Sequence, residues 1–151
     1  MLKFKQTIMG LFILIIISVV LVACAPKTFV RTMDPGWNSV EVRKELSFDQ
    51  AWNSTVDTIA KKFDIEVLSK EDGYLRTGWL HSWTGKLQDS YKVRAIIKFS
   101  PDKRKLEVKS EAHYYTSGLL GLGEGWEMGT DERLTTTLRT DLMGKVGRVA
   151  R

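Results

Sequence analysis

The chain has 151 residues, the size of one domain with a core of its own. Its 23 Lys and Arg residues against 18 Asp and Glu residues give a net charge of +5, with both signs well mixed, so we predict no nucleic-acid partner. The single cysteine excludes an intrachain disulfide. The two histidines, His81 and His113, stand beside no nucleophile or metal-ligand motif, so we predict no catalytic residues, no metal site and no bound cofactor.

The first 23 residues have the pattern of an export signal. Lys3 and Lys5 precede an apolar run from Ile8 to Val22. This run has about 15 residues, whereas a membrane-spanning helix needs about 20 and a signal peptide has an apolar core of about 7 to 15. We therefore predict a signal peptide over residues 1–23.

The end of this run, Leu21-Val22-Ala23-Cys24, resembles the lipobox of bacterial lipoproteins. The resemblance implies that a diacylglycerol is joined to the thiol of Cys24, that the chain is cut between Ala23 and Cys24, and that the new amino group is acylated. Several acyl chains together anchor a protein stably, because each buried methylene contributes about 0.8 kcal/mol. The alternative for Cys24 is a free thiol, either buried or behind an uncleaved anchor helix.

Ala25 follows the cysteine where, in the enterobacterial sorting pattern, an aspartate directs retention in the inner membrane. The resemblance therefore implies a domain anchored in the cell outer membrane through its lipid and facing the periplasm. Removing Lys3 and Lys5 with the signal peptide takes the 23 basic residues to 21 against 18 acidic ones, a net charge of +3. The mature chain is thus only weakly basic.

Residues 24–39 are predicted to form the lipidated N-terminus and a tether. Two prolines and Gly36 interrupt any regular pattern in this segment. Phe29, Val30 and Trp37 are apolar, so the segment either docks on the domain or on a partner, or is a mobile strap.

A strand over Val40–Leu46 and then a helix are predicted next. Ser47 and Gln50 have the spacing of a capping box at the start of the helix. Apolar residues then recur at spacings of four, three and four, namely Trp52, Val56, Ile59 and Phe63. This one-sided pattern indicates a helix lying on a sheet.

Two hairpins follow, because the apolar period changes to two. Ile65–Val67 and Leu75–Trp79 flank the turn Glu71–Gly73, and Tyr91–Phe99 and Leu106–Tyr114 form the second pair. Alternation predicts one buried and one solvent-exposed face. The exposed face either suits anionic lipid headgroups or is the ordinary polar face of such a sheet, and its basic residues are Arg76, Lys92, Arg94, Lys98, Lys105 and Lys109.

The segment Ser117–Thr130 is predicted to be a loop, because its five glycines argue against a regular strand. Its apolar side chains either fold back over the end of the sheet or bind a partner. We predict the second, with the partner-binding residues Leu119, Leu120, Leu122, Trp126 and Met128.

A closing helix is predicted with Thr130 as its cap and with Asp131 and Glu132 in its first turn. Its apolar positions are Leu134, Leu138, Leu142, Val146 and Val149. The element order is thus β-α-β-β-β-β-α. We predict a single α+β domain over residues 40–151, with an antiparallel sheet of about five strands and two helices on one face.

This order resembles the helix-grip domains of the BamC (lipoprotein-34) family of outer-membrane assembly lipoproteins. Phe48–Trp52, Phe63–Val67 and Glu71–Trp79 look like that family's helix, strand, turn and strand. That family carries two such domains and a long partner-binding N-terminal segment, whereas one domain and a short tether are predicted here. The resemblance implies a protein-binding accessory or scaffold in envelope assembly, with envelope proteins as partners. The alternative is a lipid-anchored carrier or sensor that holds an apolar small ligand between helix and sheet.

Overall fold

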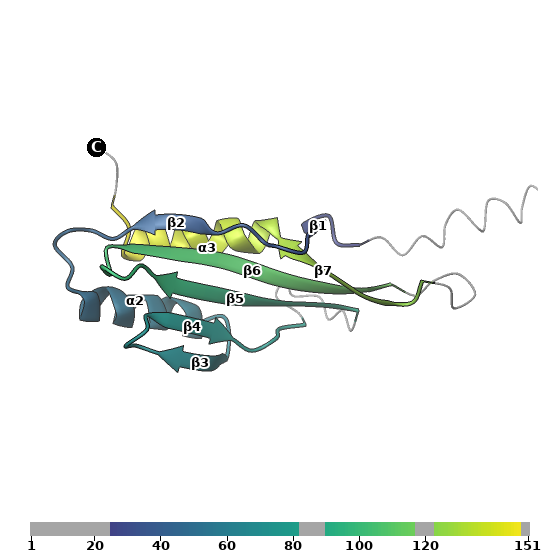
Figure 1. The fold of residues 1–151 in the computed structure, drawn as a ribbon, viewed down its shortest axis with the longest axis horizontal. Helices are drawn as coiled ribbons and strands as arrows, with labels where there is room; N and C mark the ends of the chain where they lie inside the picture. The colour runs from purple at the N-terminus through teal and green to yellow at the C-terminus, as the bar shows by residue number, and fades with distance from the viewer. Residues whose placement is uncertain (1–24, 82–89, 117–122, 149–151) are drawn as a thin grey trace, which may run out of the picture.

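The computed structural model describes residues 25–81, 90–116 and 123–148, and these form an α+β domain (Figure 1). The elements are β1 (Phe29–Arg31), β2 (Asn38–Glu41), α2 (Phe48–Ala60), β3 (Ile65–Ser69), β4 (Tyr74–Thr77), β5 (Tyr91–Phe99), β6 (Lys105–Thr116), β7 (Gly125–Asp131) and α3 (Glu132–Lys145). The predicted α+β class is confirmed. Neither of the two described helices has the length and apolar character needed to cross a bilayer. The predicted signal peptide and the lipidation site Cys24 lie outside the described residues.

The described strands form one antiparallel sheet of seven strands, so the prediction of about five strands was wrong. The order is β1-β7-β6-β5-β4-β3, and β1 and β3 lie at opposite edges (Figure 1). β2 lies off this path and pairs with the first part of the long strand β6, whereas β7 pairs with its last part. The two strands absent from the prediction are β1 and β7.

β7 lies in the segment that was predicted to be a loop. That prediction was wrong for residues 125–130, because pairing with β6 on one side and β1 on the other offsets the low strand propensity of glycine. Gly129 also makes room for β1. A Cβ at this position would lie 2.6 Å from the ring of Phe29 and closer still to the carbonyl oxygen of Val30. The first part of the predicted loop, 117–122, lies outside the described residues.

β1 lies in the segment that was predicted to be a tether, and there the chain is docked on the domain. The ring of Phe29 packs edge-on against Tyr91 and at a tilt against Tyr114, with centroids 6.2 and 6.0 Å apart. Ala25 packs against the core as well. Of the two alternatives that the sequence leaves open, docking on the domain is the one that these residues adopt.

The helix starts follow local capping. The hydroxyl of Ser47 accepts the N–H of Gln50, and the side chain of Gln50 accepts the N–H of Ser47, which is the predicted capping box. α3 begins one residue later than predicted. Its N-cap is Asp131 and not Thr130, because Thr130 still pairs with β1 as part of β7.

Two other boundaries differ from the prediction by a few residues. The strand predicted at Val40–Leu46 is β2, and it spans Asn38–Glu41. It ends there because the chain leaves β6, and the next residue, Val42, forms an isolated bridge with Gly147 beyond α3. α3 ends at Lys145, before the predicted end near Val149, and the bridge at Gly147 follows it. Val149 itself lies outside the described residues.

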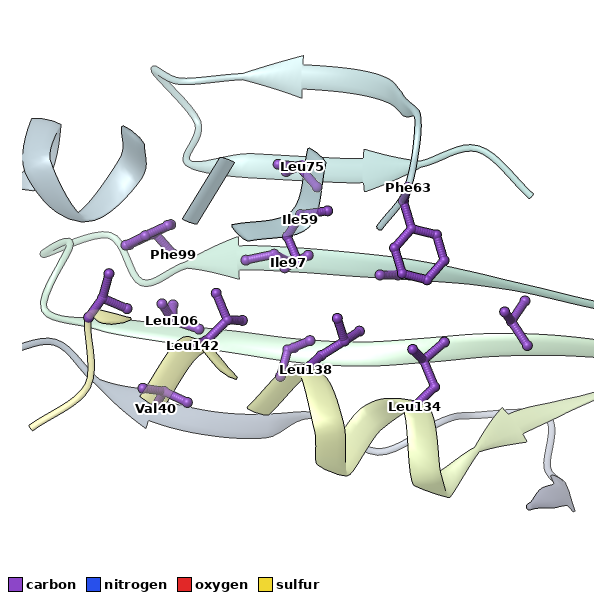
Figure 2. Close-up of a cluster of buried hydrophobic side chains, with 14 of the residues drawn as sticks. Val40, Ile59, Phe63, Leu75, Ile97, Phe99, Leu106, Leu134, Leu138 and Leu142 are labelled. Carbon is purple, nitrogen blue, oxygen red and sulfur yellow. The ribbon is translucent and has the colours of Figure 1, made fainter. Parts of the chain in front are cut away.

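Both helices cover the same face of the sheet, and one core lies between the two layers (Figure 2). Ile59 of α2 and Leu138 of α3 are fully buried, as are Leu75 of β4 and Ile97 of β5 beneath them. Because all four belong to one cluster, the helices are held by the sheet and by each other. Neither α2 nor α3 lies on the opposite face, and no other helix is found among the described residues.

Candidate interaction face

The uncovered face of the sheet, here called the outer face, carries a row of aromatic and basic side chains. In β5 and β6, buried and half-exposed residues alternate as predicted, so Lys92 and Arg94 share the outer face with His113. The register places Lys92 opposite His113, and Met128 of β7 lies on the other side of His113. Three neighbouring strands therefore contribute to one continuous surface.

Five of these side chains pack into what we call the cation–aromatic cluster, namely Trp79, Lys92, Arg94, His113 and Trp126. The His113 ring lies 4.4 Å from the ring of Trp79 and 6.3 Å from that of Trp126, centroid to centroid. The Lys92 ammonium lies 4.9 Å from the Trp79 centroid and 4.5 Å from the Trp126 centroid. The Arg94 guanidinium lies 4.5 Å from the Trp79 centroid. These distances are within the range of cation–π attraction.

Carboxylates neutralise much of the basic character predicted for the outer face. Glu111 forms a 2.6 Å ion pair with Arg94 and lies 3.7 Å from Lys109. Two further pairs on this face are Arg76 with Glu66 and Lys105 with Glu107. Lys92 has no carboxylate partner among the described residues, and its charge faces two indole rings instead. The face is therefore more aromatic and less basic than the sequence alone indicates.

His113 lies between the two tryptophans, and its surroundings favour the neutral imidazole. Burial lowers the pKa of His113 below its usual value of 6.5, the charges of Lys92 and Arg94 lower it further, and the charge of Glu111 acts in the opposite direction. At neutral pH the ring is therefore uncharged, so it stacks with Trp79 without adding a third cation to the cluster.

Exposed apolar side chains extend the cluster along β7. Trp126 and Met128 are 44% and 45% exposed, and the ring of Tyr115 packs against that of Trp126 at 5.4 Å. Both β7 residues belong to the set that the sequence predicted to bind a partner. The other three residues of that prediction lie outside the described residues, namely Leu119, Leu120 and Leu122.

The sequence predicted Trp79 near a strand end and His113 on the exposed side of its strand. It did not predict that the two side chains lie next to each other. The two-residue alternation and the hairpin register were the available signal for pairing Lys92 with His113. Trp79 joins them because the next residue, Leu80, forms an isolated bridge with Val93 of β5. No local sequence pattern predicts this bridge.

A second polar cluster is buried on the helix side of the sheet. The carboxylate of Asp131 accepts hydrogen bonds from the hydroxyls of Thr28 (2.8 Å) and Tyr91 (2.5 Å) and from the N–H of Leu134 (2.8 Å). Burial raises the pKa of Tyr91 well above its usual value, and the hydrogen bond to Asp131 and its charge raise it further. Asp131 therefore joins the residue before β1 to β5 and α3, and it has a structural role.

The cavities and the metal-ligand groups of the described residues are weaker candidates for a functional site than the outer face. Residues 25–81, 90–116 and 123–148 contain no gathering of three His, Cys, Asp or Glu side chains fit to hold a metal ion. An open depression of about 520 Å³ is lined by Lys44, Arg104 and Arg148, among others. A second, of about 310 Å³, lies where α2 ends beside Trp79.

No protein-family model matches the chain, and none of the curated proteins matches it at a significant level. The role of the outer face therefore rests on its own chemistry.

Proposed function

We propose that this protein is a lipoprotein anchored in the outer membrane through acylated Cys24, whose periplasm-facing domain binds envelope proteins as an accessory or scaffold in envelope assembly. The anchor rests on the lipobox-like residues that end at Cys24. The binding role rests on one observation, the exposure of Trp126 in the cation–aromatic cluster and of Met128 beside that cluster. Together they describe a binding domain that works at a membrane surface.

The composition of the outer face favours a protein as the bound molecule. Cores of protein–protein interfaces are enriched in aromatic residues, Met and Arg, and their strongest contributors are Trp, Tyr and Arg. The outer face offers Trp126, Tyr115, Met128 and Arg94 over three neighbouring strands. Arg94 is already paired with Glu111, so a partner that covers it does not bury an unpaired charge. An anionic lipid surface gains less from such a neutralised face.

The packing of the core supports binding at the surface over carriage of an apolar ligand inside the domain. Ile59, Leu75, Ile97 and Leu138 meet between the helices and the sheet and are fully buried (Figure 2). The space that a carrier needs is therefore occupied by side chains in this part of the fold. We also propose that the domain is a single BamC-like helix-grip domain extended by β1 and β7, which the two helices on one face of the sheet support.

Site-specific photo-crosslinking tests the binding role. A benzoylphenylalanine at position 128 of the anchored protein is expected to crosslink to a defined envelope protein in intact cells, identified by mass spectrometry. The matched control carries the same group at position 68, because Leu68 is 53% exposed but lies on β3, at the other edge of the sheet. Crosslinks of equal yield and identity at both positions would count against a specific face.

Substitution of the exposed β7 residues measures how much they contribute to partner binding. The double variant Trp126→Ser, Met128→Ser is expected to reduce recovery of that partner about tenfold or more, which corresponds to a loss of about 1.4 kcal/mol of binding free energy. Leu68→Ser is expected to recover it as the wild type does. Equal recovery by the double variant, at an unchanged midpoint of thermal unfolding, would reject the outer face as the binding site.

A further inference from the structure

The first described residues of the chain are fixed to the domain by main-chain and side-chain bonds. The N–H of Phe29 donates to the carbonyl of Pro26 at 2.8 Å and so closes a turn. The carbonyl of Thr28 accepts the N–H of Glu132 at 3.0 Å, and its hydroxyl donates to Asp131 at 2.8 Å. The segment between the proposed lipid and β1 is therefore part of the folded domain.

This docking sets a short distance between the proposed anchor and the domain. Cys24 is bonded to Ala25, which packs against the core, so their Cα atoms lie about 3.8 Å apart. Even a fully extended chain from Cys24 to Phe29 spans at most about 18 Å. A free tether over residues 24–39 would instead reach about 50 Å at full extension, with a root-mean-square length of about 21 Å. The domain is therefore held close to whatever Cys24 enters.

The surface next to this attachment has the chemistry of a membrane contact. We call Lys27, Val30, Arg31 and Met33 the β1 edge. Met33 is 83% exposed and Val30 is 38% exposed. Lys27 is exposed and has no carboxylate partner among the described residues, whereas Arg31 pairs with Glu127. Apolar side chains enter the interfacial region of a bilayer, and each lysine or arginine near an anionic surface adds about 1 kcal/mol.

We propose that the β1 edge rests on the phospholipid headgroups of the membrane that holds the anchor, a proposal that itself rests on the proposed acylation of Cys24. The sheet then stands on this edge, because β1 and β3 lie at its opposite edges (Figure 1). Five strand spacings place β3 about 24 Å farther from the bilayer than β1. The outer face stands upright and opens sideways. It is thus presented to the periplasmic parts of proteins embedded in the same membrane.

Lipid quenching of a single attached fluorophore tests this orientation. The acylated Cys24 does not react with thiol reagents, so a cysteine introduced by Met33→Cys is the only free thiol in the mature chain. The matched control is Leu68→Cys, which is also exposed but lies on the far edge. The full acylated protein is labelled with bimane and reconstituted into phosphatidylethanolamine–phosphatidylglycerol vesicles that contain brominated phospholipid. We expect at least twofold stronger quenching at position 33 than at position 68, and equal quenching would overturn the proposal.

A longer tether separates the role of the docked segment from that of the surface. An insertion of about 20 Gly and Ser residues between Cys24 and Ala25 leaves β1 in place but lets the domain move away from the bilayer. Quenching at position 33 is expected to fall to the value at position 68, and full quenching in this variant would overturn the role of the docked segment. A mature N-terminus found unacylated by mass spectrometry would overturn the proposed anchor and the orientation with it, whereas equal quenching on acylated protein overturns the orientation alone.

Discussion

The carboxylate of Asp131 joins three elements at one buried point, through the hydroxyls of Thr28 and Tyr91 and the N–H of Leu134. Asp131→Ala removes the cap of α3, which costs about 1 kcal/mol, and leaves buried donors unsatisfied, at about 1 to 3 kcal/mol. We expect this variant to lower the free energy of unfolding by about 3 kcal/mol. Urea denaturation followed by tryptophan fluorescence measures it, and a loss below about 1 kcal/mol would contradict this role.

Tyr91 gives the same cluster a dependence on alkaline pH. Burial and the neighbouring Asp131 raise the pKa of Tyr91 well above its usual value of 10, so the folded protein keeps this proton while the unfolded chain releases it. The stability that depends on the proton is therefore fully present below about pH 10 and decreases as the pH rises beyond it.

The matched variant for this prediction is Tyr91→Phe, which has no proton to release. We expect the difference in free energy of unfolding between wild type and Tyr91→Phe to be constant below about pH 9 and to shift against the wild type above about pH 10. Urea unfolding at a series of pH values measures this difference. A difference that stays constant to pH 11 would show that Tyr91 titrates alike in the folded and unfolded chains.

At the scale of elements, the sequence predicts α2 and the β5–β6 hairpin well, because their signals are local. The capping box at Ser47 and the alternation along β5 depend on residues only two to four positions apart. β1 and β7 lack such signals. Phe29 fills the space that Gly129 leaves open, and these two residues are 100 positions apart in the sequence. Pairing between distant segments thus made strands out of a predicted tether and a predicted loop.

A substitution of Gly129 tests the pairing of β1 with β7. In Gly129→Val the added side chain meets the main chain of Val30 and the ring of Phe29, so β1 has to move away from β7. We expect a loss of about 1 to 3 kcal/mol in the free energy of unfolding and fast hydrogen exchange at the amides of β1. Gly125→Val is the matched control in the same strand, because nothing lies within 4 Å of its Cβ position. Equal protection of β1 in both variants would mean that β7 holds β1 without this close approach.

At the scale of the whole molecule, one core makes the helices and the sheet interdependent. Leu138 of α3 is fully buried in the cluster that also holds Ile59 of α2 and Ile97 of β5. We expect Leu138→Ala to lower the free energy of unfolding by about 3 kcal/mol, with transitions by far-ultraviolet circular dichroism and tryptophan fluorescence that coincide. The exposed control Leu68→Ala is expected to change it by less than about 0.5 kcal/mol. Two separated transitions would indicate that the layers unfold independently.

The outer face is likewise a product of the whole molecule. The sequence identified Trp126 and Met128 as candidates because large apolar groups are unusual in a glycine-rich segment. It did not predict that Lys92 would lie over two indole rings, because these contacts bring Trp79, β5 and β7 together. The pairing of Glu111 with Arg94, in contrast, lies within the predicted β5–β6 hairpin. Local patterns thus identified single residues but not the surface that they form together.

The three residues that pair β1 with β7 also determine how the domain responds to mechanical force. We expect a pull applied at residue 25 to act first on this short edge strand. The next strand pairing along the chain is that of β2 with β6, which begins at Asn38. Detaching β1 frees residues 25–37, lengthens the connection by about 40 Å and removes the contacts of Ala25 and Phe29 with the core, but the buried cluster itself contains no residue of the freed segment. If Cys24 is the anchor as we propose, we expect force directed away from the membrane to turn a short connection into a long one before the core unfolds.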